Sequence, residues 1–512
     1  MVSVLQRELD LPRFVAATLV GRGIDTPKAA RAFLFPSFKH DWLDPYLIPG
    51  LGDVVDALED AVRKGRRILV FGDFDLDGIS ATTVLTRGLR ELGADTVPFI
   101  PKRFEEGYGI TAAALERVKT YGPDFLVTVD CGIACKAEVK LVQAAGVDVA
   151  ITDHHEPTDL VPEGVPVADP KIDSTCPSCV LAGAGVALKL VQALGARFGK
   201  PYLWRDFVDF ATLGTVADLM PMLGENRPLV IEGIKMMNKA PRPCIAALLE
   251  TSGAVGKPLT STNLSFSLIP RLNAAGRMGN ADLALNLLMS DDFDEAYRLA
   301  TELEGLNDQR REIEAELSEI AKVQAAEIYH GQRALVVAGE GWHEGVKGIV
   351  ASRLVGIYGV PCILLTIDGD EARGSGRSVG RVNLFAAVES ASDLLVRFGG
   401  HEAAVGITLK TKDIPAFTKA LCDYLDKLPE DDFHPLIEID TCINLDELTL
   451  ETVGALKQVA PFGQENPTPC FLARDVLLTH CRAVGAEKNH FSCTLTNGRT
   501  SISGIMFHCT DI

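Results

Sequence analysis

Three aspartates, Asp73, Asp75 and Asp77, stand at alternate positions in GDFDLDG, directly after the apolar run RRILVF and directly before a glycine. Carboxylates packed this closely repel one another, and burial makes their ionised forms more costly still. A bound divalent cation relieves the repulsion, because it supplies positive charge and takes oxygen ligands. The spacing therefore indicates a cation site, although one strand-end aspartate alone is more often a turn or cap residue.

Other acidic and imidazole side chains follow further apolar runs. Asp130 follows FLVTV at 125–129, and Asp153, His154 and His155 follow VDVAIT at 147–152. Asp218 lies inside the apolar stretch ATLGTVADLMP. In open α/β sheets, ligands bind outside the carboxyl ends of the strands. We therefore expect these residues to converge on one crevice.

The charge of this set suggests the number of cations. Asp75, Asp77, Asp130 and Asp218 sum to four negative charges, which two divalent ions would balance. Oxygen ligands with an imidazole suit Mn²⁺ or Mg²⁺ better than a structural Zn²⁺. Two such ions about 3.5–4 Å apart catalyse in-line attack on phosphorus. The set therefore predicts metal-dependent phosphoester chemistry.

The elements around these residues predict an α/β fold. Helical and strand patterns alternate through 56–65, 66–71, 80–93, 125–129, 137–146, 147–152 and 165–168, which is typical of a parallel, doubly wound sheet. A polar stretch at 291–326 predicts a connecting helix, or two in series. A second α/β unit follows at 333–367, and short β-like runs beyond about 430 predict a small β-barrel.

Composition limits the class of protein. The 512 residues carry a net charge of −19, which argues against general nucleic-acid binding but allows a local basic groove. No apolar run is long enough for a membrane helix, and the charged N-terminus does not look like a secretory signal, so we expect a cytoplasmic protein. The 12 cysteines suggest reduced thiols. CPSC at 176–179 is weak evidence for zinc, and Cys131 is expected to be a packing residue.

Nine motifs in the family's order, and a tenth block near the C-terminus, resemble those of one family. GDFDLDG, VDCG, TDHHEP and VADLMP resemble the four motifs of the DHH phosphoesterase superfamily. PKRFEEGYGI, IPRLNAAGRMG, GWHEGVKGIVASRL, GSGRSV and FGGHEAAVG resemble blocks of the RecJ family of single-stranded-DNA-specific exonucleases, and APFGQENPTP resembles a block of its oligonucleotide-binding (OB) fold domain. The resemblance implies an N-terminal helical segment at 1–45, a DHH catalytic domain at 46–290, a connecting helix at 291–330, a DHH-associated substrate-binding domain at 331–427 and an OB-fold domain at 428–512.

The resemblance also implies roles for the acidic cluster. Asp75 would hold the first metal and Asp77 the second, with Asp130 bridging them. His154 and Asp218 would complete the second site, and Asp73 would be an outer or water-mediated ligand. Asp153 would orient the neighbouring histidine. His155 would face the scissile phosphate. The implied catalytic residues are therefore His155, Asp130 and Asp153.

Two positions depart from the family pattern. Some members place a histidine four residues before the first ligand aspartate, where this chain has Phe71. The first metal would then depend more on water or on Asp73. Leu76 replaces a commoner small residue between the aspartates, and we expect it to pack against its surroundings.

Further residues are expected to bind phosphate or the DNA strand. The resemblance favours phosphate contact over surface ion pairing for Arg103, Tyr108, Arg271, Asn273 and Arg277. In the second unit, Gly345 and Lys347 lie at a helix start, which favours phosphate, and Arg373, Arg377 and His401 would lie beside them. Phe462 and Phe491 are candidate stacking platforms, but a core role is the favoured interpretation for both.

The family implies a 5′-to-3′ single-stranded-DNA exonuclease with two Mn²⁺ or Mg²⁺ ions, acting in DNA repair and recombination, and we expect a monomer. A single-strand-binding protein and a RecQ-type helicase are its implied partners. Two alternatives stay open: a DHH phosphodiesterase for short oligonucleotides or cyclic dinucleotides, and a non-catalytic DNA-binding replication scaffold.

Overall fold

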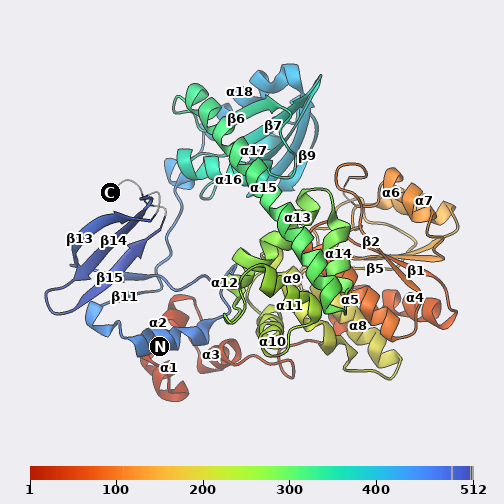
Figure 1. Cartoon of the computed structure of the whole chain (residues 1–512), viewed down its shortest axis with the longest axis horizontal. Helices are drawn as coiled ribbons and strands as arrows, with labels where there is room; N and C mark the ends of the chain where they lie inside the picture. Colours follow the sequence, from red (N-terminus) through yellow and green to blue (C-terminus); the bar gives the residue numbers. More distant parts are fainter. Residues whose placement is uncertain (108, 486–487, 508, 510–512) are drawn as a thin grey trace.

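The computed structural model describes the whole chain except residues 108, 486–487, 508 and 510–512. Figure 1 shows four parts: N-terminal helices at 2–34, a first lobe at 51–289, a second lobe at 335–425 and a C-terminal β unit at 441–506. The long helix α15 (Phe293–Ile328) joins the two lobes. The N-terminal helices lie beside the C-terminal β unit, although they stand at opposite ends of the sequence.

The sheet of the first lobe is parallel and has five strands. These are β1 (Ile68–Phe71), β2 (Thr96–Phe99), β3 (Phe125–Thr128), β4 (Asp148–Thr152) and β5 (Val167–Ala168). Their spatial order is β2-β1-β3-β4-β5. The chain therefore changes direction across the sheet between β1 and β3, which is where ligands bind in doubly wound folds.

Successive side chains of β1 enter two different cores, as the period of a strand requires. Ile68 and Val70 pack with helices on one face, and Leu69 and Phe71 pack with helices on the other. The first face carries α4 (Leu51–Arg63), α5 (Leu76–Glu91), α8 (Gly183–Arg197) and α9 (Val208–Ala217), and the second carries α6 (Ala112–Lys119) and α7 (Lys136–Ala144). The predicted doubly wound fold is therefore confirmed.

Strand β2 has no counterpart in the sequence-based prediction. Pro98 lies inside it and cannot donate a hydrogen bond to a neighbouring strand. β2 is an edge strand that pairs only with β1 among the described strands, so the lost donor is tolerated there. A proline inside a short apolar run conceals such a strand from pattern-based prediction.

The remaining helices of the first lobe lead toward the second. They are α10 (Asn226–Lys239), α11 (Pro243–Thr251), α12 (Ser261–Asn263), α13 (Ile269–Arg277) and α14 (Ala281–Met289). Helix α15 then continues without interruption for 36 residues, or about 54 Å at 1.5 Å per residue. Its Leu303 belongs to the first-lobe core and its Leu317 to the second-lobe core. One helix therefore forms the connection.

The second lobe contains a mixed five-stranded sheet. Its strands are β6 (Leu335–Glu340), β7 (Cys362–Asp368), β8 (Glu371–Arg377), β9 (Leu395–His401) and β10 (Ala404–Lys410), in the order β6-β7-β8-β10-β9. Only β6 and β7 pair in parallel. The lobe's helices are α16 (Lys347–Tyr358), α17 (Leu384–Glu389) and α18 (Ile414–Leu425).

The two chain ends share a core. Helices α1 (Val2–Leu9), α2 (Arg13–Gly21) and α3 (Pro27–Leu34) pack around Val459, which follows α19 (Leu450–Ala455). In the C-terminal β unit, β11 (Thr441–Ile443) pairs with β12 (Phe471–Ala473), and β13 (Leu477–Val484), β14 (His490–Thr496) and β15 (Ser501–Met506) form a separate antiparallel sheet. These described strands make two open sheets.

Across the described ranges, no helix is both long and apolar enough to cross a membrane.

A buried ion pair fixes α8 in the first lobe. The Lys189 ammonium contacts the Glu225 carboxylate, and both side chains are buried. Glu225 also accepts hydrogen bonds from the Leu43 amide (2.8 Å) and the Ser178 hydroxyl (2.6 Å). Burial lowers the pKa of Lys189 to about 8, although Glu225 opposes this shift. The pair joins the loops around the first-lobe core to the helix that faces the strand ends.

We predict that Glu225→Ala lowers the free energy of unfolding by about 3 kcal/mol, because it leaves a buried ammonium without its anionic partner. Glu232→Ala is the matched control. Its surface pair with Lys235, at 3.2 Å, is worth at most about 0.5 kcal/mol. Urea unfolding of both variants measures the difference. Equal losses in the two variants would contradict the prediction.

Candidate metal centre and phosphate-binding groove

The three aspartates after β1 take different positions. Asp75 is the N-cap of α5, and its Oδ1 accepts hydrogen bonds from the amides of Asp77 (2.9 Å) and Gly78 (3.1 Å). Asp73 and Asp77 are buried, and Asp75 is partly exposed. The cap therefore starts the helix at a point where three carboxylates lie close together.

Asp130 follows the neighbouring strand β3 and has a left-handed backbone, with φ of 62°. Such a conformation is uncommon outside glycine and clusters at functional sites. A Cβ on Gly183 would lie 2.6 Å from Asp130 Oδ1, so only glycine lets α8 approach this carboxylate so closely. The strand end and the start of α8 together fix Asp130 beside the aspartates that follow β1.

His154 connects the residues that follow β4 to those that follow β1 and β3. Its Nε2 lies 3.0 Å from Asp130 Oδ1 and 3.6 Å from both Asp77 Oδ2 and Asp218 Oδ2. Asp218 reaches this point from the C-cap of α9. Residues from four separate segments therefore meet, as the strand-end argument predicts.

The possible ligand atoms fall into overlapping groups. Atoms of Asp73, Asp75 and Asp130 lie within 4.8 Å of one another, and so do atoms of Asp77, His154 and Asp218. A third group joins Asp130 to His154 and His155. Asp130 thus belongs to the group that contains Asp75 and also contacts the group that contains Asp77. This arrangement is compatible with two neighbouring cations that share one carboxylate.

Burial and mutual repulsion perturb the protonation of the cluster. Burial, reinforced by Asp75, raises the pKa of Asp77 to about 7. Burial, reinforced by Asp77, raises the pKa of Asp218 to about 7, and the pKa values of Asp73 and Asp130 also rise well above the ordinary carboxylate value, mainly through burial. Burial and the charge of His155 lower the pKa of His154 to about 4. Negative charge in this cluster is therefore costly without a cation.

Three buried polar atoms support the fit of cations to this site. Asp73 Oδ1, Asp130 Oδ1 and His154 Nδ1 have no hydrogen-bond partner among the described residues. A neutral imidazole that faces three carboxylate oxygens must either donate a proton to them or share a cation with them. Unsatisfied buried oxygens beside a neutral histidine match the ligand set of Mn²⁺ or Mg²⁺.

Helix α8 supports one of these carboxylates directly. The amides of Gly183 (2.7 Å) and Ala184 (3.0 Å) donate to the two carboxylate oxygens of Asp77. These amides belong to the first turn of α8, where the helix dipole favours negative charge. A Cβ on Gly214 of α9 would lie 2.3 Å from Asp77 Oδ1, so only glycine lets α9 approach this carboxylate so closely. Asp77 is therefore held between two helices.

His155 and Asp153 form a hydrogen-bonded pair beside the cluster. His155 Nδ1 lies 2.7 Å from Asp153 Oδ1, while the other oxygen of Asp153 accepts from the Ile133 amide at 2.9 Å. Burial alone would lower the pKa of His155, but the hydrogen bond to Asp153 and the negative charge of Asp153 raise it to about 9. Asp153 is buried, whereas the His155 side chain is 45% exposed. Asp153 therefore fixes the orientation of the His155 imidazole, which is partly exposed at the opening of the site.

The two residues that depart from the family pattern, Phe71 and Leu76, are both buried in hydrophobic cores. Phe71 is fully buried and stacks on Phe99, with ring centroids 5.0 Å apart, on the sheet face that carries α6 and α7. Leu76 is fully buried, as predicted. Cys131 is also buried, and burial raises the pKa of its thiol, which agrees with a packing role. Among the described residues, the group around Asp75 contains Asp73 and Asp130 and no histidine.

Three of the arginines predicted to bind phosphate lie near one another between the lobes. Burial, with the charges of Arg103, Arg310 and Arg377, lowers the pKa of Arg277 to about 10. Burial also lowers the pKa of Arg103, and the nearby charges of Asp73 and Asp75 oppose this shift. Arg277 donates to the Gly345 carbonyl of the second lobe at 3.3 Å. We name Arg103, Arg277 and Arg377 the arginine cluster, and Arg103 is its member nearest to Asp73 and Asp75.

Other predicted phosphate ligands have intramolecular partners. Arg271 forms a bidentate ion pair with Glu304 of α15. Asn273 Oδ1 accepts a hydrogen bond from the Leu76 amide at 3.1 Å. Lys347 is buried and donates to Glu344 (2.7 Å) and to the Arg373 carbonyl. Phosphate contact by Arg271 or Lys347 would require these bonds to break. Arg373 and His401 are exposed, and Tyr108 lies outside the described residues.

Three features of the site are absent from the sequence-based prediction. The first is the pair of α8 amides on Asp77, which the sequence signals only as the small residues AGAG. The second is His343, whose ring meets Phe104 edge-on at 5.5 Å and so joins the lobes. The third is Asp169, which follows β5, is fully buried and has a pKa raised by burial to about 7. Its position after a strand could have marked it.

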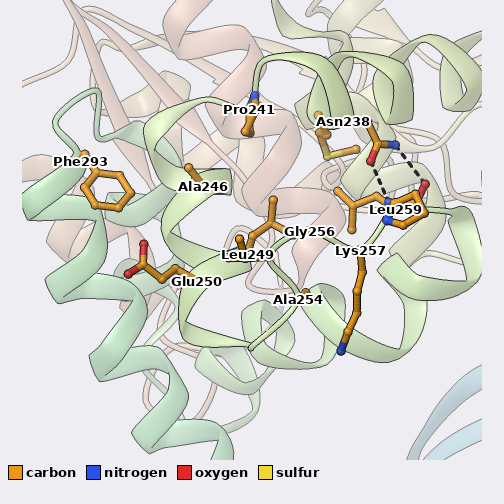
Figure 2. A pocket seen from close by; sticks show the side chains of 13 residues that line it. Asn238, Pro241, Ala246, Leu249, Glu250, Ala254, Gly256, Lys257, Leu259 and Phe293 are labelled. Atoms are coloured by element: carbon orange, nitrogen blue, oxygen red, sulfur yellow. Dashed lines mark hydrogen bonds between the residues drawn. The ribbon is translucent and has the colours of Figure 1, made fainter.

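A separate cavity of about 630 Å³ lies away from this cluster (Figure 2). Residues of α10, α11 and the 252–259 loop surround it, and Phe293 lies at its edge. Asn238 holds the loop by exchanging hydrogen bonds with the backbone of Leu259, at 2.8 and 3.0 Å. Its lining contains one carboxylate, Glu250, and none of the predicted site residues. We therefore place the candidate site at the strand ends of the first-lobe sheet, and not in this cavity.

The raised pKa of Asp218 predicts the pH dependence of the metal-free protein. Between its ordinary pKa of 3.8 and about 7, the folded protein keeps a proton that the unfolded chain releases. This contribution to the free energy of unfolding is therefore lost as the pH rises through about 7. We predict that Asp218→Asn is more stable than the parent at about pH 8 in chelator, and that the difference disappears near about pH 4. Parallel urea-unfolding curves for the two proteins at all pH values would contradict this.

Comparisons with known proteins agree with this geometry. Family models match at residues 67–215 (DHH family, N-terminal domain), 331–427 (DHHA1 domain) and 439–512 (RecJ OB domain). The protein named single-stranded-DNA-specific exonuclease RecJ of Bacillus subtilis is 37% identical over 511 residues, which cover 99% of this chain and 64% of the relative. The protein of that name in Salmonella typhimurium is 34% identical, covering 90% of this chain and 84% of the relative.

A solved structure extends the likeness to three dimensions. The crystal structure of RecJ in complex with Mn²⁺ from Thermus thermophilus superposes with a TM-score of 0.85 at 31% identity, over 99% of this chain and 72% of that one. The chain spans 64% and 65% of the length of the Bacillus subtilis and Thermus thermophilus relatives. With DHH, DHHA1 and RecJ OB domains in this order and identities above 30% over most of the sequence, the chain belongs to the RecJ family.

Proposed function

We propose that this protein is a metal-dependent exonuclease that hydrolyses single-stranded DNA stepwise from the 5′ end. The observation that carries the proposal is the pair of ligand groups that meet at Asp130, between β1 and β3. The relatives named single-stranded-DNA-specific exonuclease support the substrate, and the related structures in complex with Mn²⁺ and Mg²⁺ support the metals.

We assign the metal ligands from the two groups. Asp75 and Asp73 would hold a first ion, and Asp77, His154 and Asp218 would hold a second, with Asp130 close to both groups. Divalent ions, when bound, supply an activated water for attack on phosphorus and positive charge for the leaving oxygen. Asp73 takes a closer role than the family resemblance implies, because Phe71 supplies no ligand and Asp73 lies within reach of Asp75 and Asp130.

The remaining residues bind and orient the substrate. Asp153 holds the His155 ring through Nδ1, so that the imidazole can donate to a phosphate oxygen at the opening. The arginine cluster binds the phosphates of the strand, because planar guanidinium groups match phosphate oxygens in pairs. Because Arg103 lies near the carboxylates, the cluster holds the DNA backbone at the site and keeps the scissile phosphate beside the ligand groups.

The C-terminal β unit extends the binding surface for the strand. Its match to the RecJ OB domain supports a role in holding single-stranded DNA by backbone contact and base stacking. Phe462 is partly buried beside the core of the N-terminal helices, so the packing role is the better supported one for this residue. Action in repair and recombination, and partnership with a single-strand-binding protein or a RecQ-type helicase, remain predictions from the family. Cytoplasmic location remains a prediction from the sequence.

A nuclease assay with end-labelled single strands tests the proposal. We expect the 5′ label to be released first, in the presence of Mn²⁺ or Mg²⁺, and blunt duplex DNA to resist. Asp130→Asn should reduce the rate by roughly a thousandfold or more, because the metal ligands act as a unit. Asp148→Asn is the control, since this exposed residue begins β4 at the opposite edge of the sheet. First release of the 3′ label would refute the polarity.

Metal binding is measured independently by calorimetry. We expect Mn²⁺ to bind the parent protein and Asp148→Asn alike, and to bind Asp130→Asn much more weakly, because Asp130 lies next to both ligand groups. Failure of the parent protein to bind Mn²⁺ would favour a non-catalytic scaffold. Faster cleavage of dinucleotides than of long strands would instead favour a phosphodiesterase for short substrates.

A further inference from the structure

The residues that precede β12 form a loop that the first lobe and the N-terminal helices hold by its backbone. We name residues 459–467 the clasp loop, and they include most of the motif APFGQENPTP. Its carbonyls accept hydrogen bonds from distant donors: Ser261 Oγ bonds to the Phe462 carbonyl at 2.6 Å, and the Met222 amide bonds to the Gln464 carbonyl at 2.8 Å. The first lobe therefore grips a segment that follows it by some 200 residues.

Arg227 of α10 forms the centre of this contact. Its guanidinium donates to the carbonyls of Val459 (3.3 Å) and Ala460 (3.0 Å) in the clasp loop, and to those of Phe33 (3.0 Å) in α3 and Met222 (3.4 Å). It also lies 3.6 Å from the centre of the Phe33 ring. One side chain thus connects the N-terminal helices, the first lobe and the clasp loop.

Arg227 is unusual because it is 2% exposed and its partners among the described residues are carbonyls and an aromatic ring. Burial lowers its pKa to about 9, and the charge of Arg22 adds to this effect. Burying a guanidinium without a carboxylate costs free energy. The arrangement is therefore poorly suited to stability alone, and its benefit is a fixed geometry among three segments.

Arg22 holds the other end of the loop. It pairs with both carboxylate oxygens of Asp440 (2.6 and 3.2 Å), just before β11, and donates to the Pro467 carbonyl (2.8 Å) and to Asn466 Oδ1. Asn466 is fully buried, and its Nδ2 donates to the carbonyls of Val459 (3.0 Å) and Pro461 (2.7 Å). Asp440 also accepts from the Cys470 amide at 2.8 Å. Both strands of the β11–β12 pair are thereby anchored at the same point.

We propose that Arg22 and Arg227 are positioning residues that lock the C-terminal β unit to the first lobe at one fixed distance from the carboxylate site. The inference rests on the proposed function. A strand long enough to reach both parts gains affinity only if their separation is fixed, because the second contact then forms at high effective concentration. Neither arginine touches the carboxylate cluster, and neither takes part in the chemical step.

The first test measures shape without DNA. Small-angle X-ray scattering of Arg227→Met should show a larger maximum dimension and a more mobile C-terminal unit than the parent protein. Arg205→Met is the matched control, because Arg205 is an exposed arginine of the same lobe that contacts Tyr202 and Trp204. Arg22→Met, which removes the partly buried pair with Asp440, serves as a second variant if Arg227→Met does not fold. Scattering curves that match the parent in the folded variants would overturn the proposal.

The second test separates positioning from catalysis. For a single strand of about 30 nucleotides, longer than one OB-fold site, Arg227→Met should raise KM by roughly tenfold and leave kcat unchanged. For a dinucleotide, both constants should equal those of the parent protein and of Arg205→Met. Equal increases in KM for both substrates, or a fall in kcat, would refute positioning. If the parent cleaves no strand, the proposed nuclease function fails, and the scattering result still decides whether the lock exists.

Discussion

The molecule is organised around one electrostatic constraint, the cost of holding several ionised carboxylates together in a buried place. Burial and repulsion raise the pKa values of Asp73, Asp77, Asp130 and Asp218. Burial limits how far water can offset this cost, and the protein offsets it with a helix N-terminus on Asp77 and with ligand groups that suit divalent ions. The strand order places these groups at the sheet's switch point because only there do neighbouring loops diverge and leave room for a ligand.

The same constraint, the cost of burying like charges together, also applies to the arginine cluster. Arg103, Arg277 and Arg377 are partly buried cations with lowered pKa values, which face one another unfavourably until an anion arrives. Under the proposed function, a phosphate backbone bound beside the arginine cluster would relieve this repulsion. The single helix α15 connects the cores of the two lobes, while Arg277 and His343 join the lobes at the site itself. Under the proposed function, substrate binding and the contact between the lobes would therefore share the side chain of Arg277.

Much of this arrangement could be predicted from the sequence, because it follows from local patterns. The apolar runs before Asp73, Asp130 and Asp153 mark parallel strands, and the carboxyl ends of such strands must meet at one edge. Strand β2 could not be found this way, since Pro98 imitates a break. The partners of Arg271 and Lys347, and the α8 amides on Asp77, depend on which helices pack together. Periodicity along one segment carries no information about such contacts between segments.

The core that the N-terminal helices share with Val459 can be completed only late in synthesis. Leu5, Val15 and Leu19 of the N-terminal helices are buried against one another and against Val459. These helices precede residue 459 in synthesis, so before it leaves the ribosome their apolar surface is covered only in part, by one another and by Leu223. Apolar surface that is transiently exposed in this way is prone to non-native association. The contact with Val459 thus completes a core whose other members are synthesised much earlier.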